Sequence, residues 1–287
     1  MISVTIDPHS GFCVGVVRAI KKVEKFLSDN PETKLFCIGS IVHNSEEVRR
    51  LEKEGLVTIT NKCIQETPVS TVLIRAHGEP PATYKDIKNA NHKLIDATCK
   101  VVLNLQQKIR KTYCENPDKQ IVIFGKHGHA EVIGLQGHTE NKAVVINDIS
   151  EIEGKIDMQK DILLFSQTTM SQSQFVNLEL SLKKYCEKNV KRFNTICKQV
   201  VNRENQLKLF AKSKDIIIFI SGRDSSNGQQ LYKICFESNP NCYLISTPEE
   251  IRKEWFSDEI SVGICGATST PLWLMEKTAQ LIMKITN

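Results

Sequence analysis

The 287-residue sequence lacks most of the short motifs by which enzymes are recognised. It contains no CxxC, CxxCH, HExxH, Walker A or GxGxxG pattern. These absences exclude a zinc ribbon, a haem attachment site, a zincin, a P-loop and a Rossmann dinucleotide site. Long hydrophobic runs are also missing. No purely apolar run is longer than IIIFI at residues 216–220. Because roughly 20 apolar residues are needed to cross a bilayer, we expect no transmembrane helix.

The first ten residues, MISVTIDPHS, lack the basic start and the apolar centre of a secretory signal, so we expect a cytoplasmic protein. A large excess of one charge is also missing. The formal net charge is +5, and the lysines are spread among glutamates without a basic block. This distribution argues against a nucleic-acid or membrane partner and is compatible with an anionic ligand or an acidic protein.

Cysteine, by contrast, is abundant. Ten cysteines are many for a cytoplasmic protein, in which disulfides are rare. We expect most of them to be buried thiols, whereas those in polar loops beside glycine are candidates for metal or redox chemistry.

Short apolar, β-branched runs alternate with longer stretches of helical period. In the first helical stretch, Val16, Ile20, Val23 and Leu27 fall on one face, with lysines and Glu24 opposite. This alternation predicts an α/β fold with mainly parallel sheets. The predicted strands are residues 2–6, 34–38, 71–74, 121–124, 161–165, 216–220, 243–245 and 260–264.

Three kinds of feature return three times in the same order, which indicates an internal repeat. Each repeat starts with a cysteine, and a strand ending in glycine follows 25 or 26 positions later. Four residues after the glycine stands a histidine or serine, and a third small polar element follows a further strand. The cysteines are Cys13, Cys99 and Cys197; the glycines are Gly39, Gly125 and Gly222; the later residues are His43, His129 and Ser226, then His77, Thr168 and Ser269.

The repeat predicts three small α/β domains. We expect an N-terminal arm at residues 1–15, then domains at 16–97, 98–193 and 194–287. In open α/β sheets, ligands bind outside the carboxyl ends of the strands, where these polar loops lie. Three such domains facing inward would share one central site.

Three cysteines at matching positions of a repeat are candidates for metal ligands. A single cysteine at a strand end is more often a buried small hydrophobe. Here each one precedes a predicted helix, whose amino-terminal end favours the thiolate. Three thiolates suit either an iron–sulfur cluster or a zinc ion with an open fourth position, and the spacing does not choose between them.

The histidine, serine and asparagine loops form a set rich in hydrogen-bond donors, beside glycines that permit close backbone approach. Each residue alone is typical of a helix cap or a polar surface. Together they predict a site for a phosphate or diphosphate group. The set consists of His43, His77, His129, Ser225, Ser226, Asn227 and Ser269.

Two glutamates follow histidines by two residues, and Glu131 is the better candidate for a proton donor. Glu79 runs into two prolines, whereas Glu131 opens a helical stretch, where an acid is also an ordinary feature. A dry, anion-filled cavity would raise the pKa of Glu131. Thr168 in SQTTMS is explained equally well as a helix cap, so a catalytic hydroxyl there rests on its position in the repeat.

Taken in order, these motifs resemble the 4-hydroxy-3-methylbut-2-enyl diphosphate reductase family, which acts last in the methylerythritol phosphate route to isoprenoids. The resemblance spans residues 11–271, and the order and spacing of the motifs make it specific. The motifs are GFCVGV, IVHN, RAHGEP, DATC, GHAEVIG, QTT, FNTIC, SSN and TSTP.

The resemblance implies that Cys13, Cys99 and Cys197 hold a [4Fe-4S] cluster in which one iron has no protein ligand. It implies that the donor-rich set holds the diphosphate, that the allylic hydroxyl lies near Thr168, and that Glu131 supplies protons. Two electrons and two protons then convert the substrate to isopentenyl or dimethylallyl diphosphate. The family further implies a trefoil of three α/β domains around the cluster and a separate electron donor such as a ferredoxin or flavodoxin.

The sequence departs from the family pattern at four positions near the motifs. Lys100 stands where proline is usual, Gln199 and Val200 replace an Ala-Thr pair, and Cys265 occupies a threonine position. None of these changes removes a residue of the predicted site. We expect them to act on substrate affinity or on the cluster potential.

Two other functions fit the cysteines. A non-catalytic cluster protein would keep the three thiols without the acid and the diphosphate set, and the retention of Glu131, Thr168 and the serine and asparagine loop argues against it. A zinc hydrolase acting on a phosphorylated substrate would use the same cysteines, and the colour of the protein would distinguish it from a reductase.

Overall fold

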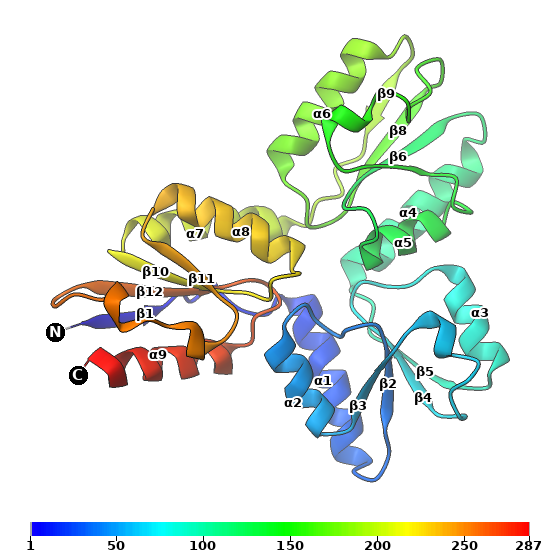
Figure 1. Cartoon of the computed structure of the whole chain (residues 1–287). Helices are drawn as coiled ribbons and strands as arrows, with labels where there is room; N and C mark the ends of the chain where they lie inside the picture. The colour runs from blue at the N-terminus through cyan, green and yellow to red at the C-terminus, as the bar shows by residue number, and fades with distance from the viewer. Residues whose placement is uncertain (1, 287) are drawn as a thin grey trace. The chain divides into compact units, whose positions relative to one another are not determined.

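The computed structural model describes residues 2–286 and shows an α/β chain with three four-stranded parallel sheets (Figure 1). The first sheet has the order β3-β2-β4-β5, with β2 (Leu35–Ile38), β3 (Leu56–Ile59), β4 (Thr71–Ile74) and β5 (Lys93–Asp96). The second has the order β7-β6-β8-β9, with β6 (Gln120–Phe124), β7 (Val144–Ile146), β8 (Ile162–Ser166) and β9 (Val190–Arg192). The third has the order β1-β12-β10-β11, with β1 (Ser3–Ile6), β10 (Ile216–Ile220), β11 (Cys242–Ile245) and β12 (Ser261–Gly266).

The three sheets repeat one topology. In each, two central strands are flanked by the strand that lies between them in sequence and by one further strand. The third sheet takes that further strand from the amino terminus, where β1 pairs in parallel with β12. The α/β fold class with a threefold repeat of parallel sheets is therefore confirmed, and residues 3–6 of the predicted arm form an edge strand.

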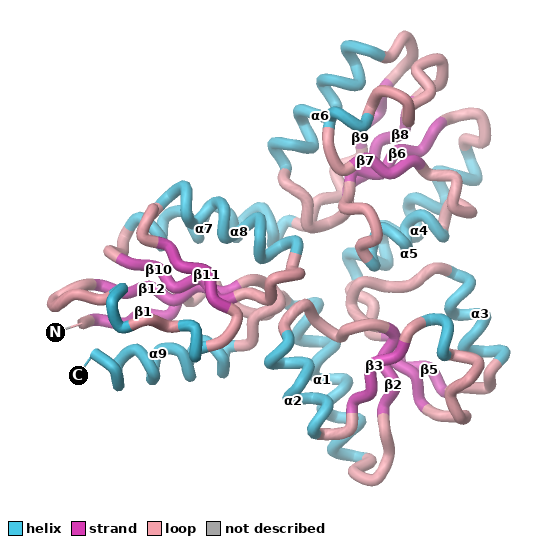
Figure 2. Tube along the Cα trace, viewed as in Figure 1, coloured by secondary structure: helices cyan, strands magenta, loops and turns pink. Residues whose placement is uncertain are grey.

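Helices connect the parallel strands and cover the sheets. Figure 2 shows α7 and α8 on one face of the third sheet and α9 on the other. No helix within residues 2–286 combines the length and the apolar character needed to cross a membrane. The helices are α1 (Val14–Asp29), α2 (Ser45–Lys53), α3 (Pro81–Asn89), α4 (Lys100–Glu115), α5 (Ala130–Gly137), α6 (Gln172–Tyr185), α7 (Lys198–Lys212), α8 (Ser226–Ser238) and α9 (Leu272–Thr286).

The chain divides into two compact units. Unit 1 contains residues 2–33, 40–56 and 201–286, and unit 2 contains residues 34–39 and 57–200. The third sheet lies in unit 1, whereas the second sheet and nearly all of the first lie in unit 2. The domain boundaries near residues 97 and 194 stay a prediction.

The strand β10 shows how a continuous apolar run serves a sheet covered on both faces. Ile216, Ile218 and Ile220 pack with α9 in one core cluster. Ile217 and Phe219 point the other way and pack with α7 and α8 in a second cluster. Because side chains alternate across a strand, a run without polar residues is expected only where both faces are buried.

The core of the second sheet lies under the two helices that carry site residues. Leu105 and Ile109 of α4, with Val132 and Leu135 of α5, pack against β6 and β8. Phe165 of β8 belongs to this cluster, is fully buried and stacks on Phe193 with ring centroids 4.4 Å apart. The packing therefore holds the start of α5 over the carboxyl ends of these strands.

The substitution Phe165→Ala tests this core. We expect it to lower the free energy of unfolding by about 3–5 kcal/mol, because the cavity would be lined by side chains that cannot collapse into it. Urea unfolding followed by circular dichroism measures the change. Phe236 is 47% exposed, so Phe236→Ala is the matched control, with an expected change below about 1 kcal/mol. Equal losses for the two variants would contradict the assignment.

Candidate active site

Each of the three repeated cysteines lies at the start of a helix and is tied to the end of a strand. Cys13 and Cys99 are the N-cap residues of α1 and α4, and Cys197 directly precedes α7. The backbone N–H of each donates to the carbonyl two residues beyond a strand end. Cys13 N bonds Thr268 O after β12 at 3.4 Å, Cys99 N bonds Ala76 O after β4 at 3.0 Å, and Cys197 N bonds Thr168 O after β8 at 2.9 Å.

Side-chain hydroxyls close two of these connections in the same way. Thr195, two residues before Cys197, accepts from Ser166 N and donates to Ser166 O, both at 2.8 Å. Ser10, three residues before Cys13, accepts from Gly266 N at 2.9 Å, and the buried Arg203 donates to Gly266 O at 2.9 Å. Ser166 and Gly266 are the last residues of β8 and β12. Both sets of hydrogen bonds therefore lie at the same position of the repeat.

The third connection uses a carboxylate instead. Asp96 Oδ1 accepts from Thr98 N at 2.8 Å and from Thr98 Oγ1 at 2.5 Å. Tyr84 donates to Asp96 Oδ2 at 3.0 Å. Ser10, Asp96, Thr195 and Arg203 were not expected from the sequence. For the first three, a polar side chain two or three residues before each cysteine was the available signal.

The three cysteines fit an iron–sulfur cluster by the chemistry of their positions. All three are partly exposed, as Cys63 and Cys186 also are, whereas Cys37, Cys235, Cys242 and Cys265 are buried. Cysteine binds metal ions through its sulfur as the thiolate. Soft thiolates are the ligands of such clusters. Cys13 belongs to unit 1, and Cys99 and Cys197 belong to unit 2.

Within unit 2, the structure brings Glu131 and Thr168 into direct contact. Thr168 N donates to Glu131 Oε1 at 2.7 Å, and Thr168 Oγ1 donates to Oε2 at 2.8 Å. The glutamate is 1% exposed. Burial raises its pKa to about 7, although the two bonds from Thr168 favour the charged form. A carboxyl group with this pKa both holds and releases a proton near neutral pH.

His77 and His129 form a pair in the same unit. His77 lies on the turn after β4, and His129 caps α5, where its Nδ1 accepts from Glu131 N at 3.2 Å. The two rings meet edge to face with centroids 5.4 Å apart. The start of α5 therefore positions a histidine and the acid on one turn of helix.

The remaining predicted residues gather in unit 1 around the start of α8. Ser225 caps this helix by accepting from Gly228 N at 3.1 Å, and its Oγ lies 3.3 Å from Ser269 Oγ. Ser269 Oγ donates to His43 O at 3.4 Å. Asn227 Oδ1 accepts from Thr268 Oγ1 at 2.8 Å.

Two further buried donors of this group lie at the start of α8. Ser226 Oγ and Asn227 Nδ2 lack a hydrogen-bond acceptor among the residues that the structure describes. Buried polar groups are nearly always paired, so two unpaired donors at a helix amino terminus indicate an acceptor that the protein does not supply. A phosphate oxygen has this chemistry.

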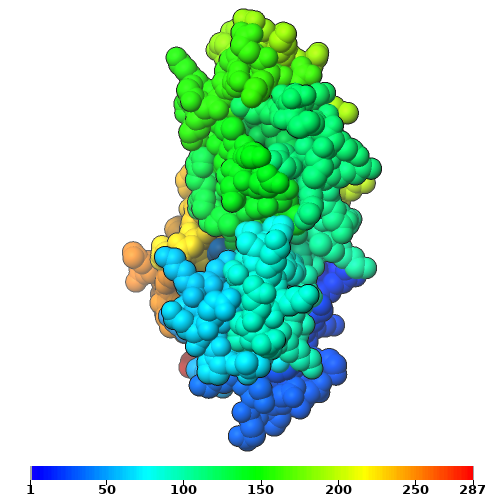
Figure 3. Space-filling view, turned by 90° about the vertical axis from the view of Figure 1, so that its right-hand side faces the viewer, coloured from blue at the N-terminus to red at the C-terminus, as the bar shows by residue number. Residues whose placement is uncertain are grey.

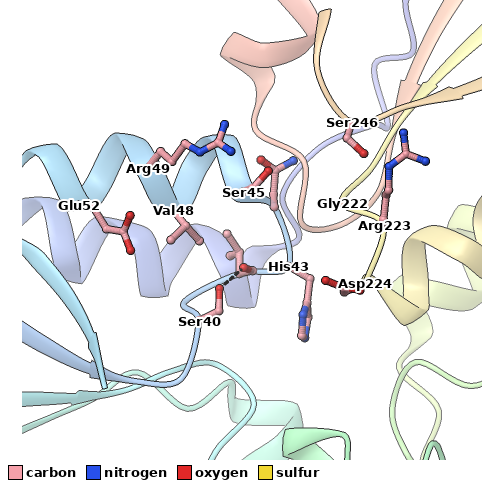
Figure 4. Close-up of a pocket in the computed structure, with 12 residues that line it drawn as sticks. Ser40, His43, Ser45, Val48, Arg49, Glu52, Gly222, Arg223, Asp224 and Ser246 are labelled. Carbon is pink, nitrogen blue, oxygen red and sulfur yellow. Dashed lines mark hydrogen bonds between the residues drawn. The ribbon is translucent and has the colours of Figure 1, made fainter. Parts of the chain in front are cut away.

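A cavity of about 530 Å³ lies beside His43 in unit 1 (Figure 4). Its walls come from the loop after β2, from α2 and from the loops after β10 and β11. Gly222 lies so close to the carbonyl of His43 that a Cβ would overlap it. Arg49, Arg223 and Ser246 also line the cavity. Sequence reasoning missed them, although Arg223 stands two residues before the predicted Ser225.

Comparison with known proteins agrees with these observations. The family model described as LytB protein matches residues 4–283. A curated protein of Phocaeicola vulgatus named 4-hydroxy-3-methylbut-2-enyl diphosphate reductase is 46% identical over 288 residues, covering 99% of each chain. One of Parabacteroides distasonis with the same name is 47% identical over 289 residues, again with 99% of each chain covered.

Two solved structures extend the similarity to the fold. A structure titled (E)-4-hydroxy-3-methyl-but-2-enyl diphosphate reductase, the terminal enzyme of the non-mevalonate pathway, matches with a TM-score of 0.73 and 33% identity, covering 99% of this chain and 100% of that one. The E-1-hydroxy-2-methyl-but-2-enyl-4-diphosphate reductase of Plasmodium falciparum matches with a TM-score of 0.84 and 25% identity, covering 98% of this chain and 87% of that one. The chain belongs to the LytB protein family.

Proposed function

We propose that the chain is a 4-hydroxy-3-methylbut-2-enyl diphosphate reductase. It takes up two electrons and two protons, breaks the C–O bond of the allylic alcohol, releases water and forms isopentenyl or dimethylallyl diphosphate. The observation that carries this proposal is the hydrogen-bonded pair of Glu131 and Thr168. It provides a buried, oriented carboxyl group in a member of the LytB protein family. The reaction needs such a proton source, which a cluster-binding scaffold does not.

Cys13, Cys99 and Cys197 are the residues that would hold a [4Fe-4S] cluster with one iron free of protein ligands. When bound, the cluster supplies the electrons and an open coordination position for the hydroxyl group of the substrate. The chain's own contribution is to hold three thiols at helix starts, each fixed by its amide bond to a strand-end carbonyl. Lys100, which follows Cys99 at the start of α4, brings a positive charge beside one of them.

The diphosphate is held by the donor-rich residues. Ser226 and Asn227 offer the unpaired donors at the start of α8, where the helix amides and dipole also favour an anion. The other proposed contacts are His43, His77, His129, Ser225 and Ser269. Binding the diphosphate orients the far end of the substrate, so that its hydroxyl group lies near Thr168.

Glu131 delivers the proton. Its carboxyl group is buried and has a pKa of about 7, so a large fraction is protonated at neutral pH. Thr168 orients it through two bonds and keeps its oxygens in place as the charge changes. A ferredoxin or flavodoxin would bring the electrons, and we place the enzyme in the cytoplasm.

Removal of one cysteine tests the cluster. Cys197→Ser is expected to lose most of the iron and sulfide found in the anaerobically prepared wild-type protein, which should be brown. Iron and sulfide analysis with visible absorption measures the loss. Cys114→Ser changes an exposed free thiol and should keep full iron content. A colourless, zinc-loaded wild-type protein would support the hydrolase instead.

Replacement of the acid tests the proton source. Glu131→Gln keeps the shape of the side chain but cannot give up a carboxyl proton, so turnover with a reduced dye should fall by about 10²–10⁴-fold. Iron content and diphosphate affinity should stay near wild type. The exposed Glu66 provides the control variant Glu66→Gln, which should turn over normally. Near-normal turnover of Glu131→Gln would remove this residue from the mechanism.

The raised pKa of Glu131 also predicts how stability depends on pH. The folded protein binds this proton more tightly than the unfolded chain does, because the pKa is about 7 when folded and 4.5 in its ordinary state. The stabilisation is therefore fully present below pH 4.5 and is lost as the pH rises through 7, by roughly 3 kcal/mol in total. Urea unfolding at several pH values measures it, with Glu131→Gln lacking this component. Identical pH profiles for the two proteins would contradict the assignment.

A further inference from the structure

The turn that carries His77 meets the helix that carries His129 at three glycines. A Cβ on Gly137 of α5 would lie 2.5 Å from Pro80 Cβ, and one on Gly134 would lie 3.7 Å from the carbonyl carbon of Glu79. Gly78, in the turn itself, has φ of +69° and faces the side chain of Gln106. The backbone of α5 thus approaches residues 78–80 at a distance that only glycine permits at Gly137.

Gln106 of α4 fills the space between these backbones. It is 1% exposed, and its Nε2 lies 3.0 Å from the position of a Cβ on Gly134 and also against Gly78. Nε2 has no hydrogen-bond partner among residues 2–286. A buried donor without a partner costs free energy, so hydrogen bonding by Nε2 does not account for a glutamine here. Its length does, because the side chain reaches both glycines.

The turn at residues 78–80 and helix α5, which meet here, are each held firmly by other contacts. On one side, Gly78 N donates to Arg75 O at 3.1 Å, and Glu79 Oε2 accepts from Asn61 Nδ2 at 3.0 Å. On the other side, Val132 and Leu135 fix α5 to the second sheet. Figure 1 shows α4 and α5 between the first and second sheets, and Figure 3 shows that the two halves of unit 2 form one continuous surface. A change at the contact must therefore move one half against the other.

We propose that Gly134, Gly137 and Gln106 are positioning residues that set the spacing of the rings of His77 and His129. The two rings lie on opposite sides of the contact, and their centroids are 5.4 Å apart. The role of the histidines as diphosphate ligands rests on the proposed function, whereas their spacing does not.

Glu131 and Thr168 lie on the same side of the contact, since α5 and the loop after β8 both belong to the second sheet. Their hydrogen bonds do not cross it. Widening the contact should therefore weaken diphosphate binding and leave proton delivery intact. A general loss of stability would not produce this separation.

Gly137→Ala in the cluster-loaded protein is the first test. The new methyl group would overlap Pro80, so the Michaelis constant should rise by about 10-fold or more as an imidazole contact to the diphosphate is weakened. The pH profile of kcat, which reports the Glu131 proton, should match that of the wild type. The Kd of inorganic diphosphate, measured by anaerobic titration calorimetry, should rise in parallel. Ile133→Ala, at a 43% exposed position of the same helix, is the control and should change neither value.

A size exchange across the contact provides the rescue. The double variant Pro80→Gly with Gly137→Ala removes the Cβ that the new methyl group would meet, so it should regain most of the diphosphate affinity. Pro80→Ala with Gly137→Ala keeps that Cβ and should not. Rescue by both double variants, or by neither, would overturn the proposal.

Gln106 gives a test that does not depend on the folding of the glycine variant. Gln106→Met keeps the length of the side chain and should bind diphosphate like wild type, whereas Gln106→Ala leaves a gap and should bind about 10-fold more weakly. Equal affinity of both variants would overturn the spacer role. If the wild-type protein bound diphosphate but did not reduce the alcohol, the proposed function would fail, and these affinities would still decide the role of the contact.

Discussion

One backbone hydrogen bond recurs at the start of the three cysteine-bearing helices, and the rest of the site depends on it. In each repeat, a cysteine amide donates to the carbonyl two residues beyond a strand end. Parallel strands all end at the same edge of their sheet, so the bond fixes the positive end of a helix to that edge. The thiol then emerges at the edge where the polar loops already lie. In the proposed function, the same contact fixes both the helix and the metal ligand.

At this edge, some polar groups are paired with other groups of the protein, and others have no acceptor among the described residues. Asp96, Ser10 and Thr195 hold the connections closed through bonds to backbone and hydroxyl groups. Ser226 and Asn227 keep one unpaired donor each. The first group gives rigidity, which positioning requires. The second lowers stability without a ligand, and a bound anion would remove that cost.

The sequence predicted the buried strands and the site loops, and the structure shows why it missed the rest. Six of the eight predicted strands, such as β10 and β12, are largely buried and carry apolar runs. The other two, β1 and β11, are outer strands. The missed strands β3, β5, β7 and β9 are short outer strands with exposed or half-exposed positions, so they show no clear period. The only sign in the sequence that Glu131 and Thr168 could meet was that both lie in strand-end loops of the same repeat. Gln106 could not be found, because a helical glutamine carries no signal of its environment.

The third sheet differs from the other two in the origin of its fourth strand. Two repeats take their fourth strand from the segment that leads directly into the next cysteine, whereas the third must take β1 from the amino terminus. The connection from β1 to Cys13 is the longest of the three. It is held by a buried arginine, Arg203, whose guanidinium also lies 3.5 Å from Asp7. A longer loop has more conformations to lose, so it needs a stronger anchor to hold a cysteine as firmly as the short ones do. The buried ion pair is therefore best understood as the anchor that makes the position of Cys13 equivalent to those of Cys99 and Cys197.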